Sequence, residues 1–266
     1  MKIILFTLNQ VYANKLVKDL IREFGSNIKL IVEPKSQLKN ISTFQILRKY
    51  LGTSGAYYTT HQSLKLLIYK IISKFYTPFG SINNRFVSYK RVAKKEGVRL
   101  ATIDDVNSKA FTQKLKKFKP DIIVSVLFSQ ILKENILKIP KKGTINIHPA
   151  FLPNYKGISP IFWSLVNKEK YSGVSIHYIN QGIDTGPIIK RKKIKISAKD
   201  TEDSLYWKCA NAGSKMLIDS IKEIDRSKLK LIKNEKGSYF SFPTTVAVSK
   251  YRKLGRRFYH FFDLFK

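Results

Sequence analysis

Acidic residues are scarce in this chain of 266 residues: 18 Asp and Glu stand against 50 Lys and Arg, which gives a formal net charge of +32. A strongly basic surface attracts anions, so phosphorylated metabolites, nucleic acid and anionic lipid are candidate partners. A compositional bias toward Lys, Ile and Asn is the alternative explanation, although such a bias would also raise Glu. Hydrophobic residues make up 43% of the chain and aromatic residues 12%, which is enough to fill a core and excludes the disordered class.

Cysteine and long apolar runs are also lacking. Cys209 is the single cysteine, so we expect a small core residue in a protein of a reducing compartment. The apolar start of the chain is too short for a signal peptide, and no apolar run approaches the roughly 18 residues of a membrane-spanning helix. We therefore expect a cytoplasmic protein. His61, His177 and His260 are unclustered and lack metal-ligand spacing, so no metal site is expected.

Apolar runs and helical repeats alternate along the chain. A strand at 2–7, a helix at 11–24 and a strand at 28–32 form an opening unit that predicts parallel strands joined by a helix. The alternation resumes from about 97 to 196, and a helix with Thr201 as its cap is expected at 201–224. The sequence therefore predicts an α/β fold with a doubly wound, mostly parallel sheet.

The segment from about 34 to 97 departs from this alternation, and we expect a helical insertion within a main domain of residues 1–224. The insertion carries a helical stripe of apolar residues with lysines beside it, namely Leu64, Leu67, Ile68, Ile71, Ile72 and Phe75. Such a stripe is typical of core packing or of a partner helix, and a helix on a membrane surface is the alternative.

Residues 225–266 form a basic, aromatic C-terminal extension. Four apolar side chains recur there at near-helical spacing, flanked by cations: Leu254, Phe258, Phe261 and Phe265. We expect these side chains to dock on the protein's own core or on a second subunit, as in a homodimer. Contact with an anionic membrane is the alternative, because apolar groups flanked by cations suit such an interface.

The segment from 143 to 187 carries the groups best suited to chemistry. A strand at 144–148 places Asn146 and His148 on the same face, because alternate residues of a strand point to the same side. A rigid loop with two prolines and a glycine follows at the carboxyl end of this strand, where open α/β sheets bind ligands. A later glycine-containing turn would present the carboxylate of Asp184.

An amide, an imidazole and a carboxylate suit acyl or formyl transfer to an amine. The Asn146 amide can donate to the carbonyl oxygen of the transferred group and stabilise the oxyanion. His148, with an ordinary pKa of about 6.5, can accept the proton that the attacking amine loses. Asp184 can orient His148, favour its protonated form, or bind a water molecule that carries protons.

At these residues the sequence resembles the 10-formyltetrahydrofolate-dependent formyltransferase family, which includes the glycinamide ribonucleotide, methionyl-tRNA and amino-sugar N-formyltransferases. The family pattern is Asn-x-His, a Leu-Pro-x-x-x-Gly loop and a later Asp-x-Gly. It is matched by Asn146 with His148, by 152–157 and by 184–186. The resemblance implies a Rossmann-like enzyme that takes a formyl group from 10-formyltetrahydrofolate without a metal, with Asn146, His148 and Asp184 as the catalytic set.

The resemblance also implies where the folate binds. Its pterin is expected against two segments that bind mainly through backbone groups, Phe128, Ser129, Gln130, Ile131 and Leu132 in the first and Gln181, Gly182 and Ile183 in the second. The residues alone leave open that Ile131 and Leu132 are simple core side chains.

The acceptor amine is less well specified. The stretch 7–14 lacks the glycines of the phosphate-binding loop in the glycinamide ribonucleotide enzyme, although 186–189 resembles that branch. The segment 159–163 is similar to the tRNA and sugar branches, and residues 225–266 are too few for the β-barrel of the tRNA enzyme. We therefore expect a small anionic acceptor, a nucleotide-linked amino sugar.

Three alternatives remain open. The first two are the phosphoribosylglycinamide formyltransferase reaction of purine synthesis and an activity like that of methionyl-tRNA formyltransferase. The third is an inactive basic module that binds nucleic acid or membrane, which predicts the loss of at least one catalytic residue. Nucleic acid is the less favoured partner, because all three catalytic residues are present.

Overall fold

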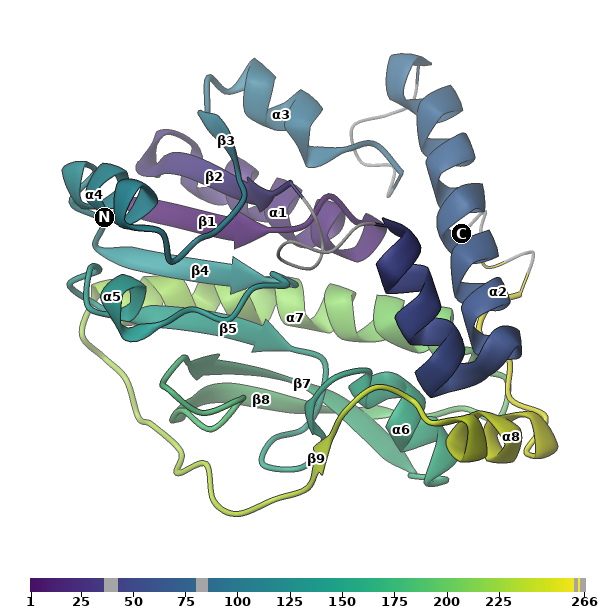
Figure 1. The fold of residues 1–266 in the computed structure, drawn as a ribbon. Helices are drawn as coiled ribbons and strands as arrows, with labels where there is room; N and C mark the ends of the chain where they lie inside the picture. Colours follow the sequence, from purple (N-terminus) through teal and green to yellow (C-terminus); the bar gives the residue numbers. More distant parts are fainter. Residues whose placement is uncertain (36–42, 80–85, 261–262, 264–266) are drawn as a thin grey trace.

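A sheet of seven strands forms the centre of the molecule (Figure 1). This computed structural model describes residues 1–35, 43–79, 86–260 and 263. The strand order is β3-β2-β1-β4-β5-β7-β8, and two short strands, β6 and β9, pair separately. The strands are β1 (Ile3–Thr7), β2 (Ile28–Pro34), β3 (Leu100–Ile103), β4 (Ile122–Val126), β5 (Thr144–His148), β6 (Lys156–Gly157), β7 (Tyr171–Tyr178), β8 (Ile188–Lys195) and β9 (Tyr239–Phe240).

The strand directions indicate a ligand site at the carboxyl ends of the parallel strands. Neighbouring strands from β3 across to β5 pair in parallel, whereas β7 pairs antiparallel with β5, and β8 with β7. The chain winds outward from β1 to β3 and then returns to the other side of β1 as β4. At such a reversal the carboxyl ends of the strands open toward ligands. The expected α/β, doubly wound, mostly parallel and Rossmann-like fold is confirmed.

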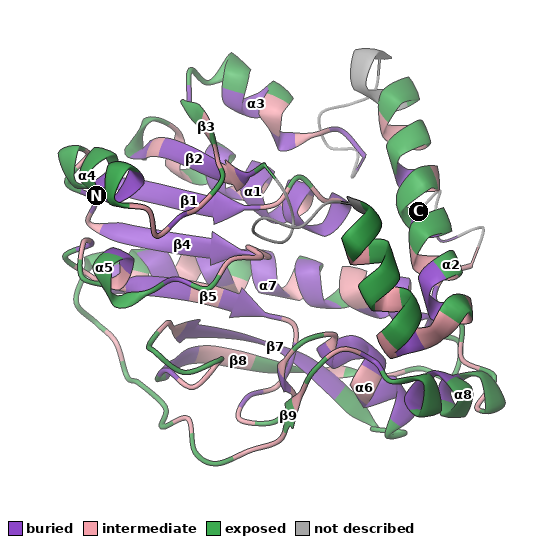
Figure 2. Cartoon of the chain, viewed as in Figure 1, coloured by how far each residue is buried: buried purple, intermediate pink, exposed green. Residues whose placement is uncertain are grey.

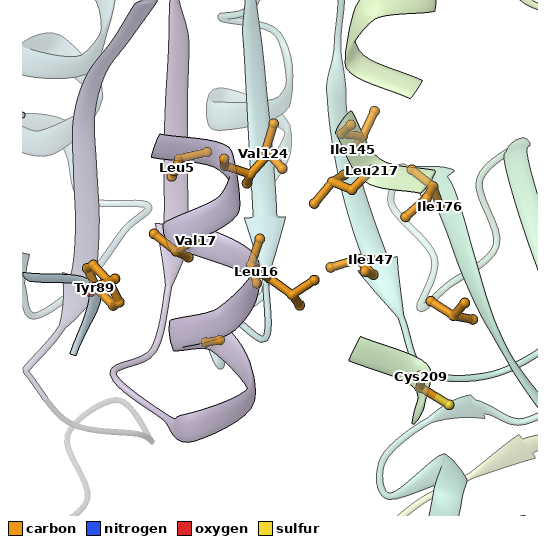
Figure 3. Close-up of a cluster of buried hydrophobic side chains, with 14 of the residues drawn as sticks. Leu5, Leu16, Val17, Tyr89, Val124, Ile145, Ile147, Ile176, Cys209 and Leu217 are labelled. Carbon is orange, nitrogen blue, oxygen red and sulfur yellow. The ribbon is translucent and has the colours of Figure 1, made fainter. Parts of the chain in front are cut away.

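Helices cover both faces of the sheet (Figure 1). On one face α1 (Val11–Phe24) and α7 (Glu202–Asp225) pack over the larger buried cluster, where Cys209 lies as a core residue as expected (Figure 3). On the other face α4 (Lys109–Lys117) and α5 (Glu134–Leu137) cover a second cluster. The remaining helices are η1 (Gly25–Asn27), α2 (Thr43–Phe79), α3 (Tyr89–Lys95), α6 (Pro160–Val166) and α8 (Thr245–Lys253).

The expected insertion contains α2 and α3. Gly55 of α2 has a φ of 80° and a ψ of 169°, so α2 consists of two helical parts joined at a kink. The first part is largely exposed (Figure 2). The second part contacts the body of the molecule through Ile68 and Ile72, which pack against a small buried cluster that includes Tyr69.

The core interpretation of the apolar stripe is wrong for four of its six residues. They are exposed by 45 to 74%: Leu64, Leu67, Ile71 and Phe75. The physical reason lies at the start of α7, where the buried carboxyl of Asp203 accepts hydrogen bonds from Tyr12 of α1 and Tyr69 of α2. Glu202 beside it pairs with the buried Lys65 of α2 at 3.5 Å. These polar contacts turn the face that bears Lys65 and Tyr69 inward and leave the stripe outside.

The C-terminal aromatic residues do not form one helical stripe. Helix α8 ends at Lys253, and Gly255 follows with a φ of 66°, which reverses the chain. Phe258 is nevertheless buried, and its ring stacks on Tyr251 at 4.8 Å between centroids and on Phe162 at 6.4 Å. Docking on the protein's own core is therefore confirmed for Phe258, whereas residues 261 and 265 lie outside the described residues.

None of the helices in the described ranges is both long and apolar enough to cross a membrane.

The aromatic packing around Phe258 can be tested by truncation. Phe258→Ala should lower the free energy of unfolding by about 3–5 kcal/mol, because a buried ring is replaced by a cavity. Chemical denaturation followed by circular dichroism measures this change. Lys253→Ala, at an exposed position close in sequence, is the control and should leave stability nearly unchanged. Equal stabilities of the two variants would contradict the observed packing.

Candidate functional site

Strand β5 directs its polar side chains away from the larger core cluster. Ile145 and Ile147 point into that cluster, so Asn146 and His148 lie on the opposite face of the strand, as the alternation predicts. The His148 side chain is only 6% exposed. One ring nitrogen, Nε2, lies 2.8 Å from the backbone oxygen of Tyr155, which can only accept a hydrogen bond. This contact assigns a proton to Nε2 and turns Nδ1 toward the rest of the site.

The loop after β5 is held by the neighbouring strand. Ser175 of β7, which pairs with His148 in the sheet, donates through its hydroxyl to the backbone oxygen of Ala150 at 2.7 Å. The same hydroxyl accepts from the backbone N–H of Leu152 at 3.1 Å. The start of the loop is thereby fixed to the sheet, and the backbone that reaches Gly157 returns over His148.

Asp184 comes from the turn between β7 and β8 and meets this loop. Its Oδ2 lies 3.6 Å from His148 Nδ1 and accepts a hydrogen bond from the backbone N–H of Gly157 at 2.8 Å. The three predicted catalytic residues are thus gathered around one point, although they come from segments 36 residues apart in the chain. Asn146 and His148 are neighbours on one face of β5, and the turn that carries Asp184 folds back over this face.

His177 is a site residue that sequence reasoning missed. It pairs with Asn146 across β5 and β7, and its Nε2 lies 3.2 Å from Asn146 Nδ2 and 3.4 Å from Asp184 Oδ1. The expectation that His177 is unclustered is therefore wrong, because antiparallel pairing brings β7 beside β5. A signal was present: His177 and Ser175 alternate on β7 as Asn146 and His148 do on β5.

The surroundings set the charge states of His148 and Asp184. Burial lowers the pKa of the His148 imidazole, and although Asp184 and the Tyr155 carbonyl act in the opposite direction, the pKa stays below its ordinary value. Burial alone would raise the pKa of the Asp184 carboxyl, but His148, His177 and the Gly157 N–H together hold it well below its usual range. The site therefore combines a stable carboxylate with an imidazole that is neutral near pH 7.

This arrangement can move a proton and stabilise an oxyanion. His148 Nδ1 is the nitrogen available to accept a proton, and the imidazolium so formed would face Asp184 Oδ2. Asn146 has two amide hydrogens, and at most one of them is directed at His177 Nε2, which lies 3.2 Å from the amide nitrogen. The second hydrogen remains for a substrate oxygen.

The two predicted folate segments meet at a cavity of about 230 Å³. Its lining combines Ile131 and Leu132 from the first segment with Gln181 from the second, together with Lys133 and Glu134. Leu132 is buried in the core, whereas Ile131 is 70% exposed, so the core interpretation holds for Leu132 alone.

The other predicted folate residues surround this cavity or support it. Gln130 bridges two backbone groups, donating to the Asp104 carbonyl and accepting from the Val106 N–H, both at 2.8 Å. Phe128 packs on Phe6 of β1, with 5.2 Å between ring centroids. Gly182 and Ile183 are exposed in the turn that leads to Asp184, and the buried Ser129 hydroxyl finds no partner among the described residues.

No three His, Cys, Asp or Glu residues within the described ranges are grouped so that they could hold a metal ion. The absence of a metal from the reaction remains a prediction.

Comparison with known proteins points to one family. A family model described as formyl transferase matches residues 78–221, more than half of the chain, and this range includes Asn146, His148 and Asp184. The chain is 36% identical over 137 residues to the methionyl-tRNA formyltransferase of Halothermothrix orenii, which covers 52% of this chain and 43% of that protein. The chain spans about half the length of the curated methionyl-tRNA formyltransferases that it matches.

Solved structures share the fold. An N-formyltransferase from Helicobacter canadensis, solved with folinic acid and dTDP-3-aminofucose, is 21% identical with a TM-score of 0.58, covering 91% of this chain and 71% of that one. A phosphoribosylglycinamide formyltransferase from Anaplasma phagocytophilum is 16% identical with a TM-score of 0.60, covering 91% and 98%. At these identities the likeness establishes the fold.

Histidine titration tests the electrostatics of the site. In NMR spectra of the histidine-labelled protein, His148 should titrate below about 6.5, because burial disfavours its charged form. Asp184→Asn should lower this pKa further, since the carboxylate that it removes is one of the groups that raise it. His148→Gln assigns the resonance. An upward shift of the His148 pKa in Asp184→Asn would contradict the proposed pairing.

Proposed function

The chain belongs to the formyl transferase family, and we propose that it transfers a formyl group from 10-formyltetrahydrofolate to the primary amine of a small anionic acceptor. The observation that carries the proposal is the meeting of Asn146, His148 and Asp184 at the carboxyl end of β5. The folate supplies a formyl group bound to nitrogen, whose carbonyl carbon the amine attacks.

Each catalytic side chain has a defined task in this reaction. The free N–H of Asn146 donates to the formyl oxygen, where negative charge develops as the amine adds. His148 Nδ1 accepts the proton that the amine loses and returns it to the departing nitrogen. Asp184, ionised and 3.6 Å from Nδ1, stabilises the imidazolium in between. The proton balance closes within the site, so no covalent enzyme intermediate is needed.

In this proposal the pterin of the folate occupies the cavity between the two predicted folate segments. The cavity is lined by apolar atoms of Ile131 and Leu132 and by the polar Gln181, the mixture expected for a flat heteroaromatic ring with polar edges. Because Gln181 is three residues from Asp184, a ring held here would lie close to the catalytic carboxylate.

An amino sugar carried by a nucleotide is the acceptor that the chain supports best. A phosphate at the start of α1, as in ribonucleotide binding, finds no glycine-rich loop there, and Tyr12 in the first turn donates to the buried carboxyl of Asp203. The Helicobacter canadensis structure holds dTDP-3-aminofucose on the same fold. The methionyl-tRNA acceptor is favoured by the curated relatives, but the match covers about half of their length.

Loss of His148 tests the activity and separates it from an inactive binding module. His148→Ala should lower turnover by at least about 10²-fold, a typical contribution of general acid–base catalysis. The assay mixes protein, 10-formyltetrahydrofolate and a panel of nucleotide-linked amino sugars, phosphoribosylglycinamide and methionyl-tRNA, with formylated product read by mass spectrometry.

His260→Ala is the matched control, because His260 follows α8 and belongs to none of the strands and loops that carry the site. A folate analogue should still raise the melting temperature of His148→Ala, since binding does not need the base. Nearly full turnover in His148→Ala would remove this residue from the mechanism. No product from the wild-type protein with any acceptor, despite folate binding, would favour the inactive module.

We propose in addition that the exposed face of α2 contacts an anionic membrane surface. Leu64, Leu67, Ile71 and Phe75 lie along one side of its second part, with the exposed Lys70 and Lys74 beside them. Between Glu33 and Glu96 the chain has no acidic residue. Apolar side chains flanked only by cations complement anionic lipid, whereas two copies of this basic face would repel each other.

Vesicle sedimentation tests this contact. The protein should sediment with vesicles of phosphatidylglycerol and phosphatidylcholine, less so at high salt, and not with phosphatidylcholine alone. The double variant Leu67→Gln with Ile71→Gln should lose this binding, while Leu231→Gln, at another exposed leucine, should retain it. Unchanged binding of the double variant would overturn the proposal. A wild-type homodimer that this variant converts to monomer would assign the face to a second subunit instead.

A further inference from the structure

The segment that follows α7 lies against both loops that carry catalytic groups. It runs as an extended chain past β8 and through β9 to α8 (Figure 1). On the way Ile232 pairs with Ile188 at the start of β8, and β9 pairs in parallel with β6 in the loop after β5. Residues 232–241, which we call the strap, thus join two regions that the main sheet leaves separate.

The strap reaches His148 through Tyr155. The Ser238 hydroxyl accepts from the backbone N–H of Tyr155 at 2.9 Å, and the Ser238 carbonyl accepts from the N–H of Lys156 at 2.9 Å. The carbonyl of the same Tyr155 accepts from His148 Nε2 at 2.8 Å. The ring of Tyr155 also stacks on Phe240 of the strap, with 5.2 Å between centroids. The strap therefore fixes the group that orients the imidazole.

The strap reaches Asp184 through Asn234. The Asn234 amide nitrogen donates to two backbone oxygens of the catalytic turn, those of Asp184 and Gly186, each at 2.8 Å. Both amide hydrogens are used, so the turn is gripped on either side of residue 185. The amide oxygen is buried and has no partner among the described residues. Both donated bonds end on the turn that presents Asp184, so the Asn234 side chain fixes the position of this turn.

Two glycines show how closely the strap fits. A Cβ at Gly237 would lie 2.0 Å from the Pro153 carbonyl oxygen, and a Cβ at Gly157 would lie 2.3 Å from the carbonyl oxygen of Phe240. Gly237 belongs to the strap. Gly157 belongs to the loop after β5, and its own N–H donates to Asp184. Backbone contact at both glycines leaves little freedom for the loop to move relative to the strap.

We propose that the strap sets the distance between His148 and Asp184, with Asn234 and Ser238 as positioning residues. The expected effect on turnover rests on the proposed formyl transfer. The expected effect on the His148 pKa rests on the geometry. Neither residue contacts the reacting atoms. Each acts through backbone groups, Ser238 through Tyr155 and Asn234 through the turn that presents Asp184.

Removal of the Asn234 amide is the first test. Asn234→Ala should lower turnover by about tenfold or more, because small misplacements of catalytic groups cost up to about 10²-fold. Folate binding, read as a shift in melting temperature with 5-formyltetrahydrofolate, should be retained. The pKa of His148 should fall in NMR titration, since Asp184 raises it and would move away. Lys233→Ala is the control, because this neighbouring side chain is 86% exposed.

The Ser238 variants keep the test decisive if Asn234→Ala fails to fold. Ser238→Ala removes the acceptor of the Tyr155 N–H and should lower turnover, while Ser238→Thr retains a hydroxyl and should restore it. Wild-type turnover and an unshifted His148 pKa in both Asn234→Ala and Ser238→Ala would overturn the proposed positioning role of the strap. If the wild-type protein shows no formyl transfer, the proposed function fails, and the titrations still decide the positioning role.

Discussion

Asp184 holds a carboxylate that is only 12% exposed, and its neighbours determine whether it can remain ionised there. Burial alone would favour the neutral acid, but two imidazoles and the Gly157 N–H surround the two oxygens and lower its pKa. The rest of the site follows from this charge. His148 Nδ1 faces it at 3.6 Å, and His177 lies between it and the amide of Asn146. A neutral Asp184 would leave a formed imidazolium without its counter-ion in a buried place.

The Asp184 carboxylate has these neighbours because three separate chain segments converge around it. Strand β5 supplies two side chains on one face, β7 supplies His177 and the Ser175 hydroxyl that holds the loop, and the strap holds the loop and the Asp184 turn together. The antiparallel pairing of β5 with β7 is what departs from an all-parallel sheet, and it is also what places the second histidine. The geometry of the candidate site therefore depends on the pairing of β5 with β7 rather than on one motif.

The positive charge of this molecule and the groups of the candidate site lie in different parts of the chain. The candidate site is a set of one carboxylate and two histidines, whereas the insertion carries many cations and no acidic residue before Glu96. Its apolar stripe remains outside because Asp203 and Glu202, at the start of α7, draw the polar face of α2 inward. Two buried acidic residues thus decide which face of a basic helix meets its surroundings.

The sequence by itself determined the local elements and the chemical groups. Helix 11–24, the cap at Thr201 and the alternation that pairs Asn146 with His148 follow from short-range periodicity, which depends only on neighbouring residues. Only the tertiary structure decided which residues distant in the sequence come into contact. It placed His177 beside Asn146, and it brought Asn234 to a turn 48 residues earlier. It also chose the exposed side of α2, since a stripe of apolar residues fixes a helix but not the partner of its face. Strand pairing and the docking of buried carboxyls join residues that no local pattern connects, so only the folded chain could reveal them.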